Sequence, residues 1–168
     1  RIALEIAASI AGSLKLSLSF NLITSIAMFY DLPDPVSFVQ QIYEVIHDQG
    51  IWHIELSYMP LMIKNTSYDT ICHEHLEYYS LYSLKYLFDL ADFKIINLSF
   101  NQINGGSIDL NIAKKKSKHK ECKYLIDWIL ERESINKYNE LHKQKSFFKE
   151  CENHKYLLRK LLLKLKQE

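Results

Sequence analysis

The spacing of apolar and polar positions changes along this chain, and each spacing predicts a different element. Residues 21–30 (NLITSIAMFY) are continuously apolar and partly β-branched, which is typical of a parallel strand covered on both faces. After the capping residue Asp34, apolar residues recur at helical spacing up to Ile46, so we expect a helix that ends near Gly50. Residues 51–57 (IWHIELS) predict the next strand. Strand, helix and strand together form one right-handed crossover unit of a parallel sheet.

The second half of the chain predicts a reversed hairpin and a helical tail. A helix is expected from Ser80, followed by two short strands at residues 93–101 and 107–113. The turn-forming residues 104–106 (NGG) lie between these strands, so the strands should pair as an antiparallel hairpin. After residue 118 the chain has no Gly or Pro and reads as one or two long amphipathic helices. The expected fold is therefore an α/β sheet with parallel strands that ends in an antiparallel hairpin and continues into a helical tail.

Composition and charge divide the chain into two parts. With 168 residues, of which 48% are apolar and 24% charged, it can bury one core and carry an appendage. Residues 1–113 contain 5 basic and 12 acidic side chains, a net charge of −7, whereas residues 114–168 contain 16 and 8, a net charge of +8. We expect the boundary between two units at this change of sign.

The sequence gives no indication of a membrane protein. Its longest uncharged stretch, residues 16–30, has 15 residues, and a helix needs about 20 to cross a bilayer. Three cysteines, Cys72, Cys122 and Cys151, are too widely spaced for a CxxC motif and odd in number for a disulfide set. We therefore expect a cytoplasmic protein with reduced thiols.

The chemically densest segment is residues 68–81 (YDTICHEHLEYYSL), which holds two histidines and three acidic side chains. It follows a predicted parallel strand, and open α/β sheets bind ligands at the carboxyl ends of such strands. The zinc pattern His-Glu-x-x-His is not met because position 77 is Glu, so we expect no metal site here. An imidazole beside a carboxylate is suited to proton transfer near neutral pH, although a polar surface loop with capping or packing histidines remains the alternative.

Four motifs, in this order, carry a resemblance to a known family: SIAMFYDLPDP, IWHIELSYMP, SYDTICHEHLEYYSL and INGGS. Over roughly residues 21–113 the chain resembles the sugar C-methyltransferases, which alkylate nucleotide-linked keto-deoxysugars, and their relatives in polysaccharide biosynthesis. The resemblance implies a Rossmann-like class I methyltransferase fold, S-adenosylmethionine as cofactor and a nucleotide-linked keto-sugar as substrate. It also implies a longer enzyme with a zinc-binding N-terminal domain, a central cofactor domain and a C-terminal sugar-binding domain.

By this resemblance the chain is a fragment with the C-terminal half of the cofactor sheet, at residues 1–113, and the start of the sugar-binding domain, at residues 114–168. Its four glycines, at positions 12, 50, 105 and 106, cannot form a GxGxxG loop. The cofactor-binding loop is expected upstream, and zinc only in the N-terminal domain. We therefore expect the isolated chain to be inactive.

The resemblance also assigns roles to individual residues. Glu74 and His75 match the catalytic Glu-His pair, with His75 as the general base. Asp31 stands where relatives carry a second catalytic His, so either Asp31 or His73 is expected to take that role. The substrate pocket is expected to be bordered by Tyr30, Tyr58, His73, Asn104, Gly105, Gly106 and Ser107. For the two tyrosines rim packing is an equal alternative, and for the glycines a plain turn is the stronger one.

A second class of function stays open. The α/β part could be a non-catalytic module whose basic tail binds nucleic acid or an anionic partner. Acidic residues interrupt every basic run after Lys120, which argues against nucleic acid.

Overall fold

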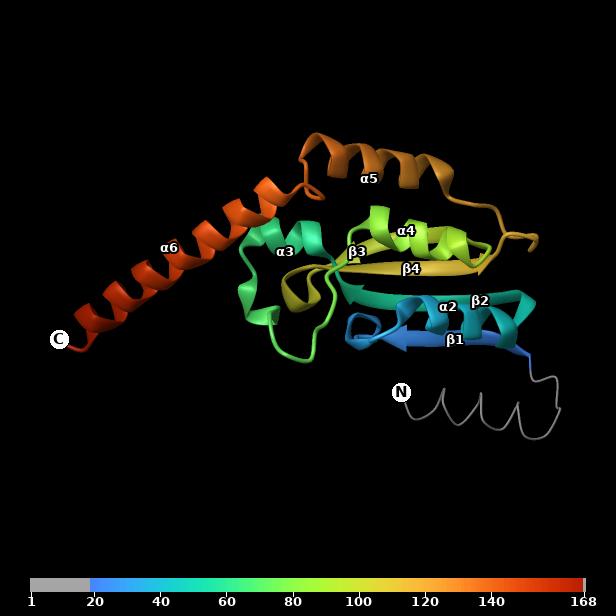
Figure 1. Cartoon of the computed structure of the whole chain (residues 1–168), viewed down its shortest axis with the longest axis horizontal. Helices are drawn as coiled ribbons and strands as arrows, with labels where there is room; N and C mark the ends of the chain where they lie inside the picture. Colours follow the sequence, from blue (N-terminus) through green and yellow to red (C-terminus); the bar gives the residue numbers. More distant parts are fainter. Residues whose placement is uncertain (1–18, 168) are drawn as a thin grey trace.

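A computed structural model describes residues 19–167 as a small twisted sheet with helices packed on it and one long helix that extends away from it (Figure 1). Residues 16–18 of the uncharged stretch lie outside the described part. The elements follow in the order β1 (Phe20–Ile26), η1 (Phe29–Asp31), α2 (Pro35–Val45), β2 (Ile46–Ser57), α3 (Met59–Asn65), η2 (Tyr68–Thr70), α4 (Leu81–Leu90), β3 (Phe93–Asn101), η3 (Ile103–Gly105), β4 (Ser107–Lys114), α5 (Lys123–Ile135) and α6 (Leu141–Leu165).

The sheet has the strand order β1-β2-β4-β3. β1 and β2 are parallel, with α2 as the crossover between them, and Ile23 pairs with Trp52. β4 pairs antiparallel with both β2 and β3, so the last two strands form the expected hairpin. The predicted fold class, a parallel sheet that ends in a reversed hairpin and continues into helices, is confirmed. This strand order and these strand directions are those of the C-terminal half of a Rossmann-like sheet.

The crossover helix begins as predicted but ends earlier. The Asp34 side chain accepts a hydrogen bond from the backbone N–H of Ser37 at 3.0 Å, and Pro35 occupies the first turn. The expectation that Gly50 ends this helix is wrong, because Gly50 lies within β2. A Cβ atom at Gly50 would come 2.7 Å from the carbonyl oxygen of Phe20. Glycine is needed here for the close approach of β1 to β2 and not for a helix end.

The core forms around Trp52 on β2, which is fully buried and packs against the rings of Phe29, Phe88 and Phe93. Its indole N–H donates to the Ser25 hydroxyl at 3.0 Å, so the ring has no unpaired polar group. Helices α2, α4 and α5 contribute to the same core. This packing fixes the carboxyl edge of β1 and β2, where the candidate site lies.

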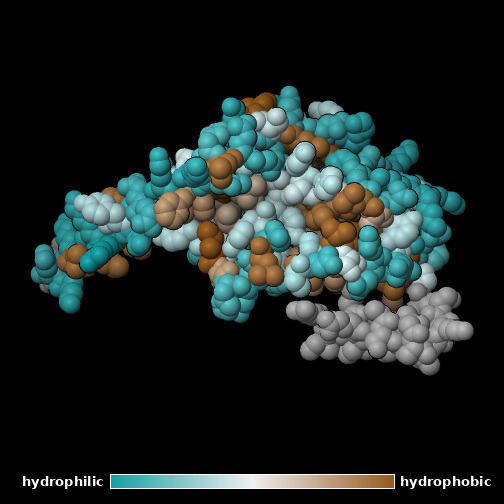
Figure 2. Space-filling model, in the orientation of Figure 1, coloured by the Kyte–Doolittle hydropathy of each residue, from teal (hydrophilic) through white to brown (hydrophobic). Residues whose placement is uncertain are grey.

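Two helices follow the last strand, as the sequence predicts, but they differ in packing. α5 buries Ile126, Ile129 and Glu133 against the body. α6 has no buried residue and projects from the body (Figure 1). Leucines remain exposed along it, and Figure 2 shows apolar side chains among hydrophilic ones on its surface. None of the helices within residues 19–167 is long and apolar enough to cross a membrane.

Candidate functional site

The segment with His73 and His75, residues 68–81, packs on the carboxyl end of β1. The backbone N–H groups of Leu76 and Glu77 both donate to the carbonyl oxygen of Tyr30, at 2.9 and 3.1 Å. Tyr30 belongs to η1, just after β1, and its side chain is buried. This double contact brings a segment that lies more than 40 residues later in the chain to the edge where open α/β sheets bind ligands.

His75 is held by Thr70 and Tyr30. Its Nδ1 lies 2.7 Å from the carbonyl oxygen of Thr70, and its ring centroid lies 4.3 Å from that of Tyr30. A carbonyl can only accept, so Nδ1 carries the proton and Nε2 of the neutral ring carries the lone pair. Nε2 makes no hydrogen bond with the part of the chain that the structure describes. The partly buried ring is thus arranged to accept a proton at Nε2.

Glu74 does not orient His75 in this structure. Its carboxylate lies 3.8 Å from Nε2 of His73, and the two side chains are 71% and 91% exposed. Within residues 19–167 the structure contains no hydrogen bond between Glu74 and His75. His75 is held instead by the carbonyl oxygen of Thr70.

Tyr30 lies beside His75, and Asp31 follows Tyr30 at the end of η1. Burial raises the pKa of Tyr30, and the nearby charge of Asp31 raises it further, so the phenol stays protonated near neutral pH. One carboxylate oxygen of Asp31, Oδ1, is buried and has no hydrogen-bond partner among the described residues. A protonated phenol beside an imidazole with an unpaired nitrogen can bind a polar ligand.

Glu55 is a neighbour of this site that the sequence reasoning missed. It lies near the carboxyl end of β2, and its charge is a further cause of the raised pKa of Tyr30. The side-chain amide of Asn101 donates to Glu55 at 3.3 Å and to Asp109 at 3.1 Å. The sequence does contain a signal for Glu55. It is an acidic side chain near the end of a strand in which every second side chain faces the core.

Tyr58 is placed differently from the other expected pocket residues. It is buried just after β2, and its hydroxyl donates to Glu133 on α5. Burial, and then the charge of Glu133, raise the pKa of Tyr58. The hydroxyl is therefore committed to Glu133 and not free for a ligand. Nothing in the sequence distinguishes Glu133 from the other acidic residues of the tail.

The turn at residues 104–107 packs against α3 and the residues just after it. A Cβ atom at Gly105 would come 2.4 Å from Oγ of Ser67, and one at Gly106 would come 2.7 Å from the Leu61 side chain. Both glycines have positive φ, and Asn104 is also left-handed, with φ of 51°. The carbonyl of Gly105 accepts from Asn65 at 2.8 Å, and Ser107 donates to the carbonyl of Ile103 at 3.0 Å. These contacts make the segment a tightly packed turn at the same edge as Tyr58.

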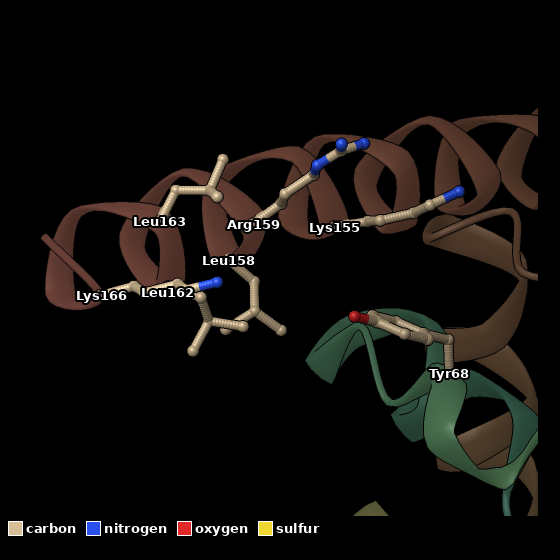
Figure 3. Close-up of a pocket in the computed structure, with 7 residues that line it drawn as sticks. All are labelled: Tyr68, Lys155, Leu158, Arg159, Leu162, Leu163 and Lys166. Carbon is tan, nitrogen blue, oxygen red and sulfur yellow. The ribbon is translucent and has the colours of Figure 1, made fainter.

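Two cavities lie between α6 and the body. One of about 330 Å³ is lined by Met59, Met62, Ile63, Leu76, Glu77, Tyr78, Gln144 and Phe147. The other, of about 380 Å³, lies where the last turns of α6 pass Tyr68, and Leu158 and Leu162 point to the Tyr68 side of the helix (Figure 3). The hydroxyl of Tyr68 lies 2.8 Å from Nδ1 of His154 and links the two walls of this second cavity. Neither is lined by His75 or Glu74.

The described residues offer no metal centre. Within residues 19–167, no group of three or more His, Cys, Asp or Glu side chains is arranged to hold a metal ion. His73, Glu74 and His75 are consecutive but do not converge on a common point with other ligands.

Comparison with known proteins places both parts of the chain. Residues 6–98 match the family described as a methyltransferase domain, and residues 102–168 match that described as a C-methyltransferase C-terminal domain. The chain is 27% identical over 106 residues to the C-methyltransferase NovU of Streptomyces niveus. This region is 63% of the chain and 25% of NovU, so the chain spans about a quarter of that relative. In structure it is similar to a Bacillus halodurans C-125 protein assigned as a methyltransferase, with a TM-score of 0.47, 14% identity, and coverage of 58% of this chain and 64% of that one.

Proposed function

The chain belongs to the methyltransferase-domain family, which matches more than half of its length, and on this premise we propose that it is part of a C-methyltransferase. In our proposal the complete enzyme transfers the methyl group of S-adenosylmethionine to a carbon atom of a nucleotide-linked keto-deoxysugar. The match of residues 102–168 to a C-methyltransferase C-terminal domain, and the similarity to NovU, support carbon as the acceptor. The order of the four sequence motifs supports a sugar substrate.

The observation that carries the proposal is the arrangement of His75. Methylation at carbon requires a base that removes a proton from the carbon next to a ketone. His75 presents Nε2 without a partner among the described residues, at the carboxyl edge of the sheet, while Thr70 holds Nδ1 at 2.7 Å. The ring contact with Tyr30 at 4.3 Å restricts its orientation. A fixed imidazole with a free lone pair has the form of a general base.

In the proposed chemistry, the first step is the transfer of a proton from the substrate to His75. The C–H bond α to the ketone breaks, the proton passes to Nε2 of His75, and the electron pair moves into the enolate. The phenol of Tyr30, which stays protonated because its pKa is raised, can donate a hydrogen bond to the substrate. The roles of Asp31 as a second acid/base group and of Glu74 as a member of the catalytic pair remain predictions. When bound, S-adenosylmethionine supplies an electrophilic methyl group.

The described residues by themselves do not fit the cofactor. Its ribose and methionine parts need a glycine-rich loop between a strand and a helix. The glycines within residues 19–167 are Gly50, inside β2, and Gly105 and Gly106, in a packed turn. We propose that other parts of a longer enzyme supply this loop, and with it a zinc-binding domain. The similarity to only a quarter of NovU supports this view.

Replacement of His75 tests the proposal in the complete enzyme. His75→Asn keeps a polar side chain but removes the titratable lone pair, so turnover should fall by about 10²–10⁴-fold, the usual contribution of a positioned general base. Cofactor affinity should stay nearly unchanged. The variant should also slow the exchange of solvent deuterium into the carbon α to the ketone, measured by mass spectrometry without methyl transfer.

Two neighbouring variants test the alternative assignments. His73→Asn removes the other imidazole of the segment, whose side chain is 91% exposed and lies 3.8 Å from Glu74. Wild-type deuterium exchange in His75→Asn would remove His75 from the role of base. A loss confined to His73→Asn or to Glu74→Gln would move the assignment to that residue.

A further inference from the structure

Glu133 is a buried carboxylate in a tail that is otherwise largely exposed. It lies in the last turns of α5, and it is 2% exposed. Its two oxygens accept three hydrogen bonds: from the Tyr58 hydroxyl and from the backbone N–H groups of Leu81, at 2.6 Å, and Tyr82, at 3.1 Å. No Lys, Arg or His forms an ion pair with it in the described part of the chain. A buried charge with this many donors is held by a specific geometry and not by chance contact.

The three donors come from two junctions of the body. Leu81 and Tyr82 form the first turn of α4, where backbone N–H groups lack partners within the helix and the helix dipole favours a negative charge. Tyr58 lies between β2 and α3. Its high pKa keeps the hydroxyl protonated as a donor at every ordinary pH. A single carboxylate therefore joins the end of β2 to the start of α4.

Residues 59–80 run between these two junctions, and His75 lies on this segment. The two ends also meet directly, since the N–H of Met59 donates to the carbonyl of Tyr79 at 2.9 Å. The tail touches the segment again where Ser80 donates to Asn139 at 2.8 Å. Glu133 is thus at the point where the segment leaves the body and returns to it.

We propose that Glu133 is a positioning residue, which fixes both ends of segment 59–80 from α5 and thereby sets the place of His75 against Tyr30. The catalytic consequence rests on the function proposed above, whereas the anchoring of the segment does not. The region that matches the C-methyltransferase C-terminal domain therefore has a part in the proton-transfer site of the methyltransferase domain.

The anchoring is tested on this chain by hydrogen–deuterium exchange of backbone amides. Glu133→Gln keeps the length of the side chain but replaces one acceptor oxygen by a donor, so at least one of the three hydrogen bonds is lost. Amides of residues 66–80 should then exchange about tenfold faster, while those of β2 and β4 keep their rates. Glu131→Gln, on an exposed position of the same helix, is the matched control and should change nothing.

Tyr58→Phe provides a second variant in case Glu133→Gln does not fold. It removes one donor and leaves the two contacts to α4 intact, so exchange in residues 59–65 should increase more than in residues 71–80. If either variant accelerates exchange equally in the strands and in segment 59–80, Glu133 stabilises the fold as a whole and the proposal is wrong. Unchanged exchange in both variants would also overturn it.

The catalytic consequence is tested in the complete enzyme. Glu133→Gln should lower kcat by about 10- to 100-fold and leave KM nearly unchanged. The reason is that displacing a general base by about 1 Å reduces the rate of proton transfer by this factor. The double variant with His75→Asn should be no slower than His75→Asn alone, since Glu133 acts through His75. Additive losses would contradict this. If Glu133→Gln loosens the segment but His75→Asn keeps full turnover, the assignment of the base fails and the anchoring stands.

Discussion

At the scale of single residues, neighbours in sequence do not decide which side chains work together. Glu74 and His75 are adjacent, yet His75 is oriented by a backbone carbonyl five residues earlier, and Glu74 turns toward His73 in solvent. Tyr58 and Glu133 are 75 residues apart and share a hydrogen bond. A backbone carbonyl is always present, so it can orient an imidazole without leaving any pattern in the sequence.

The contribution of Asp89 to the stability of the fold should depend on pH. Burial alone would raise its pKa, but hydrogen bonds from Lys85, at 2.5 Å, and Lys115, at 3.2 Å, outweigh burial and lower it. A lowered pKa in the folded state stabilises the fold above the unfolded pKa of about 3.9, and this stabilisation is lost as the pH falls through the folded value. Asp89→Asn should cost at most about 1 kcal/mol at pH 7, because the pair is partly exposed, and nothing near pH 2.

Urea unfolding of both proteins between pH 7 and pH 2 measures this difference. Asp69→Asn is the control, since Asp69 is exposed and makes no ion pair with residues 19–167. A stability difference that persists unchanged at pH 2 would show that the charge of Asp89 is not its source.

At the scale of elements, the two tail helices have similar sequence patterns and different roles. α5 places Ile126 and Ile129 in the core around Trp52 and contributes Glu133 to the body. α6 contacts the body through Phe147 and His154, and it extends beyond these contacts with its leucines exposed. Helical periodicity predicts that an apolar face exists, but the position of a surface that covers it depends on the rest of the fold.

The excised segment 118–168 should therefore show no cooperative thermal transition as a monomer. The apolar residues of α5 pack against the body, and the groups that donate hydrogen bonds to Glu133 also lie in the body. Isolated helices are only marginally stable without such contacts. Circular dichroism on heating should give a gradual loss of helix, whereas the intact chain should melt in one transition. A sharp transition in a segment shown to be monomeric by ultracentrifugation would contradict this.

At the scale of the whole molecule, the candidate site residues gather at one edge of the sheet. The carboxyl ends of β1 and β2 carry Tyr30, Asp31 and, through the docked segment, His75. The described residues contain no glycine-rich loop at this edge. In our proposal, the proton-transfer groups and the cofactor-binding groups belong to different stretches of sequence.

The chain alone should consequently bind S-adenosylmethionine poorly and show no methyl transfer. Isothermal calorimetry should detect no binding with a Kd at or below about 10 μM, because the backbone N–H groups of a glycine-rich loop contribute much of the affinity for such a ligand. The complete enzyme, measured in the same way, is the positive control. Micromolar binding by this chain would mean that its residues form a cofactor site without that loop.

The sequence by itself determined the elements whose signals are local. The apolar run of β1, the Asp34 cap of α2 and the turn at residues 104–106 each act over a few neighbouring positions. The predicted parallel pair, hairpin and helical tail are confirmed, but the first strand ends at Ile26 and not at Tyr30. Helix α3 was missed because it has 7 residues, too few to show a helical period. The candidate roles of Glu74, His75 and Asp31 come from motif resemblance and stay predictions.

The tertiary structure alone decided where side chains from distant parts of the chain meet. Gly50 reads as a helix end, but the approach of Phe20 places it inside a strand. Glu133 reads as one of many solvated acids, but the first turn of α4 and the hydroxyl of Tyr58 bury it. Periodicity and caps report forces that act between near neighbours, whereas burial and orientation depend on packing between elements, which no short stretch of sequence contains.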